Sequence, residues 1–191
     1  MRTSQVRVLA LGLLVAAGGL FASAALADES FTFSKLAFWR KPWPPTLIVT
    51  GNFARSRLLA ELAQRKTDMP VLLISQEEGG DQLYYMPSNP ETMALPPEKY
   101  MEFIETMLRP KRIVFVGDAS YVPPNYIEVV KQTYPTIVIS GQDWNKNAGE
   151  LGRVLRSRTL APVYRKALRA LEEAEKHRET IDPSAPVPVA P

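Results

Sequence analysis

Four short apolar runs, each as long as a β-strand and rich in β-branched residues, constrain this chain more than any other feature. Stretches of helical length separate them. Continuous apolar strands that alternate with helices are typical of a parallel sheet buried on both faces. We therefore expect a three-layer α/β sandwich with a mainly parallel four-stranded sheet, its strands at residues 46–50, 71–75, 112–117 and 136–140.

The expected α/β domain spans residues 46–158, and its helices are expected at 53–66, 96–109, 123–132 and 144–157. A strongly charged helix is expected over 159–178. Its narrow apolar stripe consists of Val163, Ala167, Leu168, Leu171 and Ala174. Residues 179–191 form a Pro/Ala tail that contains too little apolar mass to fold, so we expect it to be disordered.

Residues 1–27 have the pattern of an export signal. Arg2 and Arg7 form a positive start, an apolar run follows, and "ALA" at 25–27 is a cleavage site of small residues before Asp28. The protein is therefore expected to be exported, to the periplasm or the cell surface. The alternative is a retained anchor, because the apolar run from Val8 to Ala27 is just long enough to span a bilayer.

Composition excludes several classes of protein. Without the leader, Lys and Arg number 21 and Asp and Glu number 20, so a net charge of +1 remains and nucleic-acid binding is not expected. The chain has no cysteine and one histidine, His177. Disulfides, thiol catalysis, a Ser-His-Asp triad and a zinc site of His and Cys are therefore not expected, and we expect no cofactor.

Residues 28–45 form an arm that mixes aromatic and basic side chains. Trp39 and Trp43 could lie at the headgroups of a membrane, with contact through residues 31–43. The favoured interpretation is that the aromatic side chains of this short arm pack on the domain.

A long connection over residues 75–95 interrupts the alternation of strands and helices. Long loops in compact domains are usually functional or disordered. We expect residues 76–90 to be a mobile flap hinged at Gly79-Gly80, with Tyr84 and Tyr85 as its contact surface.

Polar side chains follow each expected strand, where ligands bind in parallel α/β sheets. The candidate ligand-binding residues are Asn52, Arg55, Arg57, Gln76, Tyr84, Tyr85, Asp118, Gln142 and Asp143. A weaker alternative is a divalent metal site made by Glu77, Asp118 and Asp143. The purely structural interpretation of Asp118 and Asp143 is that they form turns and helix caps.

Arg55 and Arg57 lie at the start of the first helix, where positive charge opposes the helix dipole. If Asn52 is the N-cap, Arg55 occupies the third helical position. Either an external anion or an internal carboxylate should then face it. We weakly favour an internal partner, with Asp118 preferred over Glu77.

The chain resembles the type 2 cell wall-binding repeat family of surface proteins of Gram-positive bacteria. The residues that carry the resemblance are "TGNFARSRLLAELAQRKTDMPVLLIS" and "RIVFVGDASYVPPNYIEVVKQTYPTIVISGQDWNKNAGEL", within about residues 46–155. Arg55 and Trp144-Asn145 depart from the family pattern, and one unit is present where the family normally has three. The resemblance implies a Rossmann-like, non-enzymatic module that recognises an anionic wall polymer.

The leading hypothesis is an exported envelope-binding module that performs no chemistry and recognises an anionic wall or surface polymer. One alternative is a metal-dependent envelope enzyme acting on a phosphorylated or glycosidic substrate. Another is an accessory factor whose partner is an envelope protein.

Overall fold

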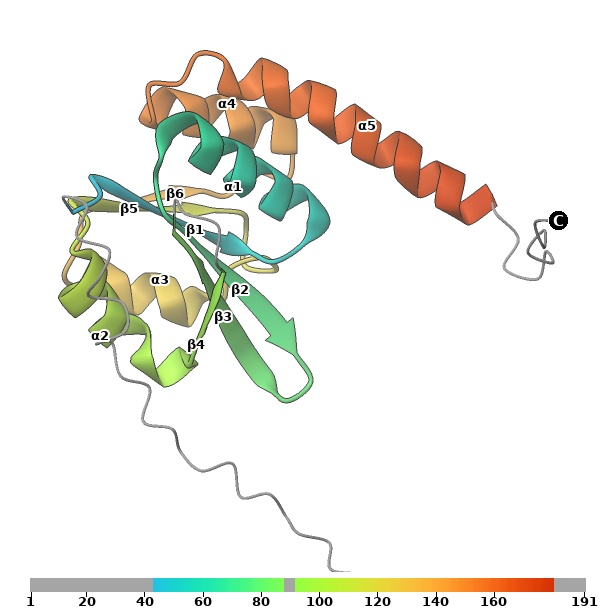
Figure 1. Ribbon diagram of the computed structural model, residues 1–191. Coiled ribbons are helices and arrows are strands. Elements are labelled where there is room, and N and C mark those ends of the chain that lie inside the picture. The colour runs from blue at the N-terminus through green and yellow to red at the C-terminus, as the bar shows by residue number, and fades with distance from the viewer. Residues whose placement is uncertain (1–42, 88–91, 181–191) are drawn as a thin grey trace, which may run out of the picture. The chain divides into compact units, whose positions relative to one another are not determined.

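The computed structural model describes residues 43–87 and 92–180, with only the backbone of residues 178–180 (Figure 1). The expected leader, most of the aromatic arm and nearly all of the expected disordered tail lie outside the described residues. None of the helices in the described ranges is long and apolar enough to cross a bilayer.

A mixed sheet of six strands organises the described residues. The strands are β1 (Thr46–Gly51), β2 (Val71–Glu77), β3 (Gly80–Met86), β4 (Met93–Leu95), β5 (Arg112–Val116) and β6 (Thr136–Ile139). Their order is β4-β3-β2-β1-β5-β6, in which β2, β1, β5 and β6 run parallel to one another. Strand β3 is antiparallel to both of its neighbours, β2 and β4. The expected α/β class and the four parallel strands are confirmed, but the expected four-stranded sheet is wrong because two more strands extend it.

The two additional strands come from the segment expected to be a mobile flap. Glu77 pairs with Gly80, so Glu78 and Gly79 form a two-residue hairpin turn, not a hinge. The sequence concealed β3 because this strand lacks the continuous apolar run of the central strands, and Leu83 is its one fully buried side chain. Residues 88–91, between β3 and β4, lie outside the described residues.

Helices lie on both sides of the sheet, with α1, α4 and α5 on one side and α2 and α3 on the other (Figure 1). Their bounds are α1 (Ala54–Thr67), α2 (Tyr100–Phe103), α3 (Pro124–Lys131), α4 (Trp144–Val154) and α5 (Leu160–Thr180). A 3-10 turn (Pro97–Lys99) and a π-helical turn (Ile104–Leu108) flank α2. The single helix expected over residues 96–109 is therefore three consecutive pieces.

Side chains of β1 alternate between two cores. Ile48 belongs to the core beneath α1, α4 and α5, together with Leu59, Leu151 and Tyr164. Leu47 precedes Ile48 in the strand, is fully buried and points to the opposite face. This alternation explains why the apolar run is continuous: both of its faces are covered.

The buried stripe of α5 differs from the one that the sequence predicted. Leu160, Tyr164 and Leu168 are buried, whereas Val163 is only half-buried and Ala174 is exposed. The stripe therefore begins one turn earlier and includes an aromatic residue, because α5 packs against α1 as well as α4. Figure 1 shows α5 continuing beyond both of these helices.

The parallel strands give the sheet two distinct edges. The carboxyl edge is where β1, β2, β5 and β6 end, and the amino edge is where they begin. Helix α4 starts at the carboxyl edge after β6, and it ends at the amino edge, where Arg112 Nη2 donates to the Val154 carbonyl at 2.8 Å. Helix α5 then returns toward the carboxyl edge, where the Glu172 carboxylate lies 3.5 Å from the Arg55 guanidinium.

Replacing Gly117 with alanine should destabilise the fold by about 2 kcal/mol or more. Gly117 has a φ of +118°, and an added Cβ would lie 2.5 Å from Cβ of Tyr121. Gly79→Ala is the matched control, because an added Cβ there meets no atom within 4 Å. Urea unfolding of both variants tests the prediction, and equal losses of stability would contradict it.

Candidate functional site

The carboxyl edge between β1 and β5 is where the sequence predicted a ligand. Tyr121 occupies this place instead. Its carbonyl oxygen lies 2.6 Å from where a Cβ on Gly51 would be, so Gly51 makes room for Tyr121. The Tyr121 ring packs edge-on against Phe53 at 5.0 Å and against Trp144 at 4.8 Å between ring centroids. Three aromatic rings thus fill the crevice in which parallel α/β sheets usually bind ligands.

The N-cap of α1 is Phe53, so the expectation that Asn52 caps the helix is wrong. The Asn52 amide donates to the Ile74 carbonyl at 2.7 Å, which extends the strand pairing past Gly51. Ser56 Oγ accepts a hydrogen bond from the Phe53 amide at 3.2 Å and donates one to the Gly51 carbonyl oxygen at 2.6 Å. A buried serine therefore supplies the cap, and Arg55 is the second helical residue.

Arg55 has an internal partner, but not one of the two that the sequence suggested. Its guanidinium lies 3.5 Å from the carboxylate of Glu172 on α5. Arg57 donates to Glu61, one turn further along its own helix, at 2.8 Å. The expectation of Asp118 or Glu77 failed because the path of α5 over α1 could not be deduced from the residues around Arg55. Both positive charges are thus balanced within the protein.

The ion pair between Arg55 and Glu172 should contribute little to stability, because both side chains are about half exposed. A double-mutant cycle of Arg55→Ala and Glu172→Gln should give a coupling energy of at most about 1 kcal/mol, reduced by salt. The control pair, Arg55→Ala with Asp118→Asn, should be additive. Thermal melts measure both cycles, and coupling only in the Asp118 pair would refute this assignment.

The aspartates of the carboxyl edge form turns and caps. Asp118 Oδ1 accepts from the Ser120 amide at 2.9 Å and from the Ser120 hydroxyl at 2.5 Å, and these bonds lower the pKa of Asp118 below its ordinary value. Asp143 caps α4 by accepting from the amides of Asn145 and Lys146. The alternative metal set, which adds Glu77, is not brought together: in residues 43–87 and 92–180, no three His, Cys, Asp or Glu side chains could hold a metal ion.

Ser120→Ala should raise the pKa of Asp118 toward its ordinary value, because both bonds to Ser120 stabilise the carboxylate and the hydroxyl is lost. A lowered pKa contributes stability at pH values above the ordinary pKa of an aspartate, and that contribution disappears as the pH falls through the folded-state pKa. The variant should therefore lose stability at neutral pH but not in strong acid. An NMR titration of the Asp118 carboxyl carbon measures the shift, and an unchanged pKa would contradict the prediction.

The remaining predicted residues do not converge on one site. Gln76 pairs with Asp81 in the hairpin, and Gln142 is exposed in the turn before α4. Tyr84 is half-buried against the core beneath α1. Tyr85 packs edge-on against Phe103 at 4.9 Å, and burial raises its pKa to about 12. The tyrosine pair is therefore part of the sheet, and its expected role as the contact surface of a flap is wrong.

A different site stands out at the amino edge. Residues 151–171 contain six basic side chains and no acidic one: Arg153, Arg156, Arg158, Arg165, Lys166 and Arg169. All six are exposed. Sequence reasoning missed this run because it treated α5 as a generally charged helix. Counting the sign of each charge along the chain would have found it.

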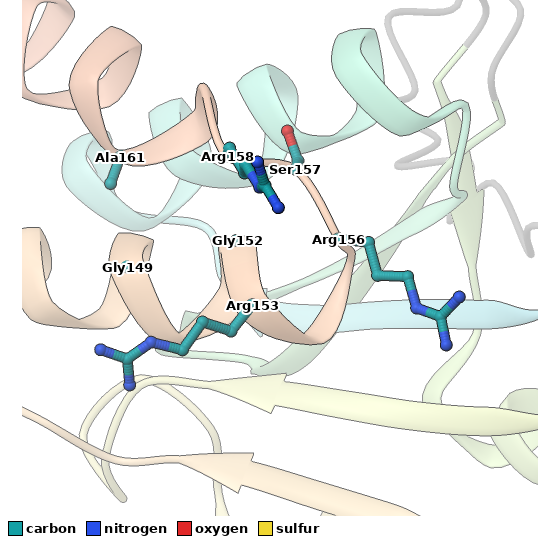
Figure 2. Close-up of a pocket in the computed structure, with 7 residues that line it drawn as sticks. All are labelled: Gly149, Gly152, Arg153, Arg156, Ser157, Arg158 and Ala161. Atoms are coloured by element: carbon teal, nitrogen blue, oxygen red, sulfur yellow. The ribbon is translucent and has the colours of Figure 1, made fainter.

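Arg153, Arg156 and Arg158 surround the connection from α4 to α5, and we call them the arginine turn. They line an open hollow of about 590 Å³, together with Gly149, Gly152, Ser157 and Ala161. Figure 2 shows Arg158 between the two helices, with Arg153 and Arg156 extending to either side. None of these arginines forms an ion pair or a side-chain hydrogen bond with another described residue.

The backbone of this connection is tightly built. The Ser157 amide donates to the Gly152 carbonyl at 2.8 Å, and a Cβ on Gly152 would lie 2.9 Å from the Ser157 carbonyl oxygen. Arg156 has a φ of +55°, the left-handed conformation that glycine usually adopts after a helix. An arginine there costs about 1 kcal/mol relative to glycine.

A second, smaller hollow of about 370 Å³ lies along α5, where Arg165, Lys166 and Arg169 are found with Glu173. We call these three basic residues the α5 basic face. They carry the same total charge as the arginine turn.

Comparisons with protein-family models, with curated proteins and with solved structures give no match to the chain. The resemblance to the cell wall-binding repeats therefore stays a prediction that depends on the sequence motifs alone.

Proposed function

We propose that the protein is an exported module that binds an anionic component of the cell envelope without performing chemistry, and that the arginine turn is its binding site. The observation that carries this proposal is the set of three exposed arginines around one hollow, with no acidic partner among the described residues. Guanidinium groups present paired N–H donors that match phosphate and carboxylate oxygens. Export is inferred from the sequence of residues 1–27.

Helix electrostatics does not account for the arginine turn. Arg153 lies in the last turn of α4, where a cation favourably offsets the helix dipole. Arg156 directly follows the C-cap of α4, where the dipole also favours a cation but the left-handed backbone disfavours arginine. Arg158 comes two residues before α5, near the positive end of that helix. The first turn of α5 contains no acidic residue to balance it. Two of the three arginines therefore sit where the fold alone does not favour them.

The form of the hollow suggests the kind of ligand. It is open, and small side chains and arginines line it, whereas pockets for small molecules are concave and bury most of the ligand. An open basic hollow suits anionic groups displayed on a larger object. The resemblance to wall-binding repeats suggests the same ligand chemistry.

The non-enzymatic part of the proposal is supported at the carboxyl edge. Tyr121, Phe53 and Trp144 fill the crevice where a substrate would be expected. Asp118 and Asp143, which the metal-dependent alternative requires, are engaged by backbone amides. These hydrogen bonds give the two carboxylates structural roles.

Binding to inorganic polyphosphate, used as a soluble polyanion, tests the proposed site. Replacing Arg153, Arg156 and Arg158 together with glutamine should weaken binding at least about tenfold, because each loses a charge-assisted contact. Raising the salt concentration should weaken binding of the unmodified protein as well. Isothermal titration calorimetry gives the affinities.

The matched control replaces the α5 basic face, Arg165, Lys166 and Arg169, with glutamine. It removes the same charge and should cost only a few-fold in affinity through general electrostatics. A single variant, Arg156→Gly, should weaken binding while raising stability by up to about 1 kcal/mol, which separates binding from folding. Absence of polyphosphate binding by the unmodified protein, or equal losses in the two triple variants, would contradict the proposal.

A further inference from the structure

We propose that the anionic component is the surface of a lipid bilayer, and that the protein docks on it through the amino edge of its sheet. This inference rests on the proposed function, because it names the partner of the same arginine turn. The amino edge combines a cluster of cations with an exposed tryptophan at the point where the N-terminal part of the chain joins the fold.

Arg112 connects the arginine turn to the start of the sheet. It is the first residue of β5, and its Nε donates to Thr46 Oγ1 at 2.9 Å while its Nη2 donates to the Val154 carbonyl at 2.8 Å. Thr46 is the first residue of β1, and Val154 is the last residue of α4. Arg112 therefore holds the end of α4, from which the arginine turn continues, next to the starts of β1 and β5.

An exposed tryptophan lies at the same edge. Trp43 precedes β1 by three positions and 60% of its surface is exposed. The Arg109 guanidinium lies 4.9 Å from its ring centroid, and Arg109 comes shortly before β5. Tryptophan and arginine both favour the headgroup layer of a membrane, where the ring meets the apolar boundary and the cation meets phosphate.

The chain outside the described residues points to the same partner. Residues 1–42 join the fold at Trp43, which is at the amino edge. Their sequence contains the apolar run over 8–27 and then the aromatic and basic segment over 31–43. Whether or not the leader is removed, the segment with the composition of an interfacial arm is attached to the edge that carries the cations.

The opposite edge favours one orientation. Glu77, Glu78 and Asp143 are exposed at the carboxyl edge, and Asp118 is half-exposed there. An anionic surface therefore attracts the amino edge and repels the carboxyl edge. A soluble polyanion satisfies the arginines equally well, but it offers no apolar layer for Trp43. The tryptophan is the reason to choose the bilayer.

The test uses the protein purified from the envelope, with its N-terminus identified by mass spectrometry. Sedimentation with vesicles of phosphatidylcholine alone, or mixed equally with phosphatidylglycerol, measures binding. The protein should bind the anionic vesicles about tenfold or more tightly than the neutral ones, and high salt should remove the difference. Comparing the two vesicles cancels any insertion of a retained leader.

Three variants locate the docking surface. Glutamine at all three positions of the arginine turn should lower the preference for anionic vesicles about tenfold or more, and the same change on the α5 basic face should lower it only a few-fold. In a Trp39→Phe background, which leaves Trp43 as the one exposed tryptophan, Trp43→Phe should abolish the blue shift of tryptophan fluorescence that anionic vesicles produce. Thermal melts confirm that each variant is folded.

Each outcome decides between the two proposals. Tight binding to polyphosphate with no preference for anionic vesicles would overturn the bilayer as partner and leave the proposed function standing. Failure to bind either would overturn both. Equal effects of the two triple variants on vesicle binding, or a blue shift that survives when both Trp39 and Trp43 are replaced with Phe, would overturn docking through the amino edge.

Discussion

The central strand β1 has no side open to water, and most of the fold follows from that constraint. All six of its residues are buried, and it is paired on both sides, with β2 and β5. Its two threonines need partners, since a buried hydroxyl without a hydrogen bond is costly. Thr50 Oγ1 donates to the Val116 carbonyl at 2.5 Å, and Thr46 accepts from Arg112. The core is thus tied to an arginine at the amino edge.

Parallel pairing around β1 gives the two edges different characters. Helices α1, α3 and α4 each follow a parallel strand, so they begin at the carboxyl edge and their C-terminal ends gather at the amino edge. Their last turns carry basic residues, which offset the helix dipoles: Arg65 and Lys66, Lys131, and Arg153. The arginine turn adds Arg156 and Arg158 to a surface that the topology already makes basic. The proposed binding surface therefore carries more positive charge than the helix dipoles require.

The carboxyl edge illustrates how a familiar ligand position can become part of the core. Gly51 and Gly117 have no side chains at the place where a phosphate could approach, but Tyr121 occupies the space that this leaves. The aromatic contacts of Tyr121 with Phe53 and Trp144 join the loops after β1, β5 and β6. Glycines at strand ends thus indicate close approach of some group to the backbone, and here the group belongs to the protein.

Local patterns in the sequence are enough to predict the four parallel strands and most of the helices, and they also contain the run of six basic residues without an acid over 151–171. These are local properties, since a continuous apolar run must be buried and helical spacing is read within a few turns. The packed fold was needed to show that β3 and β4 extend the sheet, that Glu172 faces Arg55, and that Tyr121 fills the expected crevice. Those outcomes depend on how distant elements dock. Strands near the edge of a sheet need few buried side chains, and an exposed ion pair imposes no sequence pattern on its neighbours. The tertiary structure also placed Trp43 and the arginine turn at one edge, because the direction of each parallel strand fixes where every helix ends.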